Sequence, residues 1–152
     1  GKEAAQRFAS GGKEGREALE GGLAECRRYS VKGSQLDNAV KSVVNKISSK
    51  VIEQCLPDGQ IKPFPLNGMS LMTASGARGS NVNFSQIACL LGQQELEGRR
   101  VPVMVTGRTL PSFKPFETSA RAGGFVMDRF LTGVKPQEFF FHQVCASFCC
   151  LS

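Results

Sequence analysis

The stretch Asn67–Gly98, NGMSLMTASGARGSNVNFSQIACLLGQQELEG, indicates the local fold most clearly. A glycine-rich loop with one arginine leads into a short apolar segment that stops at Gly92, and a polar turn follows. We expect a helix over residues 82–91, capped by Ser80 or Asn81, with Gly92 at its C′ position. The positions of this helix that we expect to be buried are Val82, Ile87, Leu90 and Leu91.

The glycine-rich loop, residues 75–80 (SGARGS), has the composition of a phosphate site. Glycines let a backbone approach a ligand, and the N-terminus of a following helix carries about half a positive charge. Arg78 could bind phosphate oxygens through its planar guanidinium, with Gly79 and Ser80 beside it. The Gly-Lys-Ser/Thr ending of a Walker A loop is missing. The loop alone favours the plainer interpretation, a tight turn with a surface arginine.

A dense polar cluster follows the helix. Its members are Gln93, Gln94, Glu97, Arg99 and Arg100. A solvated turn would explain such a cluster, but its place one short helix away from Arg78 raises a second hypothesis, a polar surface shared with the loop.

Residues 34–56 have the pattern of a long amphipathic helix. Ser34 suits the N-cap, Asp37 gives a capping-box-like start, and Pro57 with Asp58-Gly59 ends the pattern. The apolar stripe contains Leu36, Val40, Val43, Val44, Ile47, Val51 and Cys55. The stripe needs a packing partner, which we expect to lie upstream of Gly1. Residues 1–33 read as a flexible connector of glycine and charged residues with a turn or two of helix.

The second half of the chain predicts short elements. Alternation of Val101, Val103 and Val105 indicates a strand that Pro102 limits to an edge or a bulge. Residues 120–133 are rich in loops, and Pro136 can begin a helix that Glu138 stabilises at its N-terminus. The three phenylalanines 139–141 point in three directions on a helix, so we expect them to be buried by packing, or partly exposed in a truncated chain.

Composition limits the classes of function. The net charge is +6, which permits contact with phosphates or nucleic acid. No apolar run approaches the roughly 20 residues of a membrane span. The six cysteines do not form a disulfide framework, which favours a reducing compartment. His142 with Cys145, Cys149 and Cys150 has crowded spacing that is unlike a zinc site, and we find no catalytic acid–base pair, nucleophile or metal set.

Three strings, in this order, resemble the largest subunit of multisubunit DNA-directed RNA polymerases. They are SGARGSNVNFSQIACLLGQQELEGRR, TLPSFKPF and GGFVMDRFLTGVKPQEFFFH, and they lie within residues 63–142. Among the nuclear classes the chain looks most like polymerase I, through PFPLN, GRRVPVM and AGGFVMDRFLTGVKPQEFFFH.

The resemblance implies an α+β fragment of a large multidomain subunit, with a long funnel helix and a small mixed pore domain of short helices and strands. Residues 1–33 would be the funnel tip, 34–56 the second funnel helix, 57–133 the funnel and pore domain, and 134–142 the start of the bridge helix. The chain would line the secondary channel by which nucleotides enter. Arg78, Gly79 and Ser80 would guide nucleotide phosphates, and the polar cluster would lie at the pore near the bridge helix.

The complete enzyme of this family is a nucleotidyltransferase that uses Mg²⁺. The resemblance implies as partners the second-largest and other polymerase subunits, DNA template, RNA and nucleoside triphosphates, with no membrane, and as location the nucleus and nucleolus. Residues 143–152 depart from the family pattern, and the aspartates that hold the catalytic metal are absent, so we expect the isolated chain to be inactive. The alternative is a free-standing basic module that binds nucleic acid or anions without catalysis.

Overall fold

The computed structural model describes residues 13–28, 30–56 and 59–149. Within these ranges the elements, in chain order, are α2 (Lys13–Arg28), α3 (Ser30–Cys55), α4 (Gly68–Ala74), α5 (Asn81–Ala88), β1 (Gly92–Gln93), β2 (Glu95–Leu96), β3 (Arg99–Arg100), β4 (Phe125–Val126) and α6 (Pro136–Cys149). In these ranges, long and short helices together with two antiparallel strand pairs confirm the predicted α+β class.

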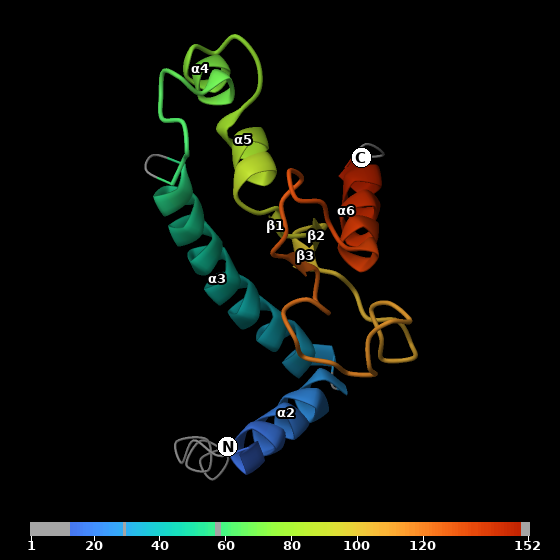
Figure 1. Cartoon of the computed structure of the whole chain (residues 1–152). Coiled ribbons are helices and arrows are strands. Elements are labelled where there is room, and N and C mark those ends of the chain that lie inside the picture. Colours follow the sequence, from blue (N-terminus) through green and yellow to red (C-terminus); the bar gives the residue numbers. More distant parts are fainter. Residues whose placement is uncertain (1–12, 29, 57–58, 150–152) are drawn as a thin grey trace.

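Helix α3 is the longest element, and the strands and α6 lie along one side of it (Figure 1). It begins at Ser30, so Ser34 lies inside the helix and the predicted N-cap at Ser34 is wrong. Asp37 also lies inside the helix, and its carboxylate accepts a hydrogen bond from Arg100 across the fold. The apolar stripe is only half buried. Val44 packs in the core, whereas Val43 and Ile47 are 57% and 51% exposed.

Helix α2 corrects the prediction of a flexible connector over residues 1–33. Residues 13–28 form a helix of 16 residues rather than a turn or two, and residues 1–12 lie outside the described ranges. Leu19 and Leu23, four residues apart, are half-buried on one face of it. The side of α2 that carries Gly21 and Ala24 faces the segment around Phe116. The helix thus forms despite the cost of three glycines within it.

The core forms where the strands meet α3. Strand β1 pairs antiparallel with β4, and β2 pairs antiparallel with β3 through a tight turn at Glu97 and Gly98, both at positive φ. Val44 of α3, Leu90 and Phe125 form one buried cluster. We call residues 92–100 and 120–126, with the part of α3 that faces them, the junction.

Residues 59–88 form an arm that extends past the end of α3 and contains α4, the glycine-rich loop and α5 (Figure 1). Asn67 caps α4, and Ser80 caps α5 as predicted. Helix α5 ends at Ala88 rather than at residue 91, with Cys89 as its C-cap, so the C′ assignment of Gly92 is wrong. Gly92 has φ 85° but begins strand β1. Val82 is 62% exposed, contrary to the prediction of burial.

The predicted strand at residues 101–105 is also wrong. Pairing stops at Arg100, and Val105 is fully exposed. Pro102 has no N–H for a ladder, and the chain then turns, with the Gly107 N–H donating to the Met104 carbonyl. Helix α6 does begin at Pro136, as predicted.

The three phenylalanines of α6 have different environments. Phe141 is buried and its ring stacks on that of Phe113, with centroids 6.0 Å apart. Phe139 and Phe140 are about half exposed, so full burial of all three is wrong for this chain.

Candidate functional site

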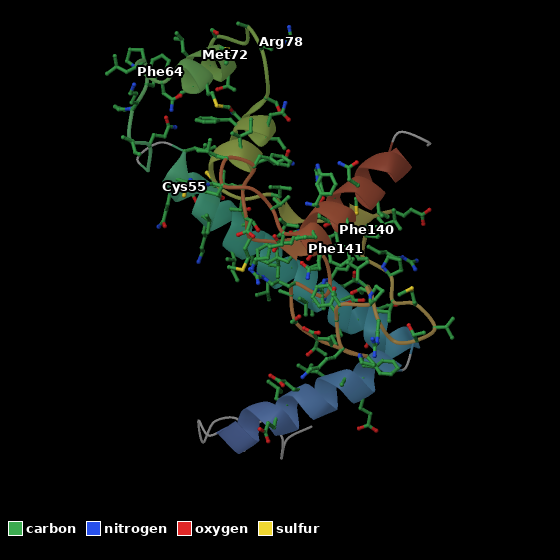
Figure 2. The ribbon with its side chains drawn as sticks, turned by 45° about the vertical axis from the view of Figure 1, so that its right-hand side comes forward. Cys55, Phe64, Met72, Arg78, Phe140 and Phe141 are labelled. Carbon is green, nitrogen blue, oxygen red and sulfur yellow. The ribbon has the colours of Figure 1, made fainter. Side chains whose placement is uncertain are left out.

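The glycine-rich loop begins where helix α4 ends, and its Arg78 is exposed to solvent. The N–H groups of Ala77 and Arg78 both reach back to the Met72 carbonyl, at 3.1 and 3.4 Å. Gly76 and Gly79 have φ of 70° and 81°, which a residue with a Cβ rarely adopts. In Figure 2 the Arg78 side chain points away from the rest of the molecule. The first half of the loop is therefore a helix-ending turn, and its amides are used within the chain.

Ser80 completes the loop by capping α5. Its Oγ accepts a hydrogen bond from the Asn83 N–H at 3.3 Å. An exposed cation thus precedes a helix N-terminus by two residues, which is a favourable arrangement for an anion. Arg78, Gly79 and Ser80 are all exposed, so a ligand would reach them from solvent.

The predicted polar cluster divides into a buried and an exposed part. Gln94 and Arg100 are buried, Gln93 is half-buried, Glu97 is exposed in the β2–β3 turn, and Arg99 is exposed at the start of β3. The hypothesis of a solvated turn is therefore wrong for Gln93, Gln94 and Arg100, because each of these side chains makes a hydrogen bond to a distant part of the chain.

The two glutamines connect three parts of the fold. The Gln93 side-chain amide donates to the carbonyls of Gln94 and Gly123, each at 2.8 Å. The Gln94 Oε1 atom lies 3.1 Å from Nδ1 of His142 on α6. The His142 ring also meets Phe130 edge-on, with centroids 5.5 Å apart. Gln94 and His142 therefore fix α6 against the junction.

Arg100 links α3 to the hairpin that β2 and β3 form. Its Nη1 donates to Asp37 Oδ1 at 3.1 Å and its Nη2 donates to the Ala120 carbonyl at 3.3 Å. The guanidinium lies directly over Gly123, where an added Cβ would come within 1.8 Å of Nη2. Only glycine leaves this space, so Gly123 is needed for the arginine to reach Asp37.

Lys41 makes a second link between α3 and the hairpin formed by β2 and β3. Lys41 Nζ donates to Glu95 Oε2 and to the Gly98 carbonyl, both at 2.7 Å. Asp37 and Lys41 are one helical turn apart on α3, so a single face of that helix holds both hairpin strands. Nothing in the sequence near Asp37 or Lys41 indicated that these residues would contact the hairpin.

A polar cleft of about 550 Å³ opens between the start of α3 and the hairpin. Its lining includes Asp37 and Asn38 from α3, and Glu97, Arg99 and Arg100 from the hairpin. The cluster thus lines a cleft with α3 rather than a surface with the glycine-rich loop, from which α5 separates it (Figure 1). The predicted polar surface shared with Arg78 is not formed by these contacts.

A carboxyl group is buried at the start of α6. Glu138 is 4% exposed; its Oε2 accepts from the Lys135 N–H at 3.2 Å, and Arg121 lies 3.7 Å from Oε1. Burial, followed by a hydrogen bond with the Asp128 carboxyl, raises the pKa of Glu138. Sequence reasoning placed Glu138 at the helix N-terminus but missed the pairing with Asp128.

Metal binding finds no support in the described ranges, where no three His, Cys, Asp or Glu side chains gather as a ligand set. Cys150 and the side chain of Cys149 lie outside those ranges, so the cluster with His142 stays untested. In the same ranges, no helix has the combination of length and apolar character that crossing a membrane requires.

Comparison with known proteins identifies the family of this chain. The model for "RNA polymerase Rpb1, domain 4" matches residues 23–126, which is more than half of the chain. The chain belongs to the RNA polymerase Rpb1 domain 4 family. The matched range includes α3, the arm and the junction, so each candidate residue lies on a family element.

The relatives of this Rpb1 domain 4 chain include polymerase I subunits of several organisms. It is 66% identical over 109 residues to the DNA-directed RNA polymerase I subunit rpa1 of Dictyostelium discoideum, covering 72% of this chain and 7% of that subunit. It is 61% identical over 120 residues to subunit RPA190 of Saccharomyces cerevisiae, covering 79% of this chain and 7% of that subunit. The polymerase III subunit rpc1 of Dictyostelium discoideum is 35% identical over 115 residues, covering 74% of this chain and 8% of that subunit.

These matches confirm the resemblance that the sequence indicated, in family and in closeness to class I. The Rpb1 domain 4 chain spans about 7% of the length of the polymerase I relatives. The roles assigned to Arg78 and to the polar cluster stay predictions.

Proposed function

We propose that this chain is a segment of the largest subunit of DNA-directed RNA polymerase I and takes part there in DNA-templated RNA synthesis. The observation that carries the proposal is the 58–66% identity to three polymerase I subunits, against 35% to the polymerase III subunit. The complete enzyme would be a nucleotidyltransferase. Its partners would be the second-largest and other subunits, template DNA, RNA and nucleoside triphosphates, and its location the nucleus and nucleolus.

Within that enzyme, the arm and the junction would line the secondary channel for nucleotide entry. Arg78 would guide nucleotide phosphates, because it is an exposed cation held on a glycine-shaped turn before the capped N-terminus of α5. Mg²⁺ would act in the complete enzyme with ligands outside this chain. The chain would supply a wall and a positive charge rather than the chemical step.

The buried part of the polar cluster would position this wall. Arg100 and Lys41 hold the hairpin on α3, and Gln94 holds α6 through His142. Glu97 and Arg99 are the residues of the polar cluster that a ligand or another subunit would contact, because both are exposed.

The test is the substitution Arg78→Ala in the assembled polymerase. Loss of one charge-assisted contact with phosphate should raise the apparent KM for nucleotides by roughly three- to tenfold and leave kcat nearly unchanged. Arg78→Lys keeps the charge, so its apparent KM for nucleotides should lie close to the wild-type value. Lys46→Ala, at an exposed position on α3, is the matched control. A KM that stays at the wild-type value in Arg78→Ala would remove this role.

A further inference from the structure

Two cysteines meet at the base of the arm. Cys55 is the last residue of α3, and Cys89 is the C-cap of α5. They flank the arm in sequence, and in space α5 lies beside the end of α3 that carries Cys55 (Figures 1 and 2). The two side chains are close enough for Cys55 to raise the pKa of the Cys89 thiol.

The packing around the pair explains this contact. Cys89 and Ile52 both pack on the buried cluster of Val44, Leu90 and Phe125. Ile52 precedes Cys55 by three residues, so the two share one face of α3. Cys89 and the face of α3 that carries Cys55 therefore border the same buried cluster.

The pair is also accessible. Cys55 and Cys89 are free thiols of intermediate exposure, whereas Cys145 is buried. The contact joins segments that the whole arm separates in sequence. A bond between the two sulfurs would therefore close the arm at its base.

We propose that Cys55 and Cys89 are a redox modification site, where a small-molecule disulfide such as oxidised glutathione converts the two thiols into a reversible intramolecular disulfide. The thiolate of Cys55 attacks the small disulfide, which gives a mixed disulfide and releases one small thiol. Cys89 then attacks the Cys55 sulfur, which forms the Cys55–Cys89 bond and releases the second small thiol. The two protons end on the released thiols, and the two electrons reduce the small disulfide.

The order of the two steps follows from the environment of Cys89. Burial, and next the neighbouring Cys55, raises the pKa of the Cys89 thiol to about 11. Cys89 therefore stays protonated at neutral pH, and a thiol is a poor nucleophile. Cys55 therefore makes the first attack. Once Cys55 is in the mixed disulfide it no longer raises the pKa of Cys89, so Cys89 can lose its proton to the departing small thiolate as it attacks the neighbouring Cys55 sulfur.

The bond would fasten the arm to α3. The glycine-rich loop with Arg78 lies between the two cysteines, and the cleft of about 400 Å³ between α3 and α5 has Ile52 and Gln86 on opposite walls. Oxidation would fix the spacing of these walls and the reach of the loop. An effect on nucleotide kinetics rests on the proposed function, but formation of the bond does not.

The experiment treats the native full-length assembly that contains this chain with defined ratios of reduced to oxidised glutathione. Alkylation stops the exchange, and mass spectrometry follows trypsin digestion. Trypsin cleaves after Arg78, between the two cysteines, so the disulfide joins two separate peptides. We expect the linked pair, two hydrogens lighter than the dithiol, at roughly tenfold or more above any linkage of Cys26, because contact raises the effective concentration of the second thiol.

Further outcomes complete the test. Dithiothreitol should release the linked peptides, and Cys55→Ser or Cys89→Ser should abolish them, while Cys26→Ser leaves them unchanged. Separate glutathione adducts without the linked pair, or linkage only after denaturation, would overturn the proposal. The readout needs no nucleotide, so failure here and failure of the Arg78 test are distinguishable.

Discussion

The arm and the junction are stabilised by different kinds of contact. In the arm, α4 has no buried residue and the loop after it is exposed, yet Asn67 and Ser80 cap both helices. In the junction, Gln94 and Arg100 are buried, and Arg100 reaches Asp37 across 63 positions of sequence. Local hydrogen bonds shape the region that meets a ligand, and long-range contacts fix the region that supports it. Substitutions should therefore act locally in the arm and globally in the junction.

The largest effect should come from Asp37→Ala. The Arg100 side chain is 2% exposed, and removal of the carboxylate leaves its buried charge uncompensated at that contact. We expect a loss of about 3 kcal/mol in the free energy of unfolding. Urea unfolding of the recombinant chain, followed by circular dichroism, measures it. Glu53→Ala, at an exposed position on the same helix, is the control, and equal midpoints for the two variants would contradict the role of the ion pair.

A smaller loss is expected for Gly123→Ala. The new Cβ would meet the Arg100 guanidinium at 1.8 Å and push it away from Asp37 and Ala120. We expect about 2 kcal/mol in the same unfolding measurement. Gly68→Ala, in the arm, has nothing within 4 Å of its added Cβ and should leave the midpoint unchanged. Similar midpoints for both glycine variants would remove the distinction between the regions.

Ser80→Ala tests the local nature of the arm. Loss of the hydroxyl that caps α5 should cost about 1 kcal/mol in the opening of that helix. Hydrogen exchange of the Asn83 and Phe84 amides should accelerate, while exchange at Val126 in the junction stays at the wild-type rate. Ser80→Asp keeps an acceptor and should preserve protection. Faster exchange throughout the junction would show that the arm does not fold by local contacts.

The smallest effect is a change of pH dependence in Glu138→Gln. The folded chain holds the pKa of Glu138 above its ordinary value of 4.5, so on raising the pH the unfolded state loses this proton first. Stability from this group is complete below 4.5 and is lost as the pH rises through the raised folded pKa. Glu138→Gln should therefore flatten the decline in unfolding midpoint over this window.

Glu53→Gln, at an exposed position on α3, is the matched control and should keep the wild-type pH profile. An unchanged slope in Glu138→Gln would contradict the raised pKa of Glu138 in the folded chain.

Local patterns predicted a useful part of the fold. The long helix ending at Cys55, the cap at Ser80 and the helix start at Pro136 all follow from interactions within a few residues. The full length of α2 was missed because its three glycines have low helix propensity. Burial of Gln94 and Arg100 was missed because glutamine and arginine are usually exposed.

The sequence by itself determined the family and the local features of the arm, since motif order, caps and positive-φ glycines are properties of neighbouring residues. Only the tertiary structure decided which polar residues became the supporting network and which cysteines met. Asp37 with Arg100, Gln94 with His142, and Cys55 with Cys89 are distant in the chain. Such pairs form because burying a polar group is costly without a partner, and that partner is fixed only when the helices and strands pack.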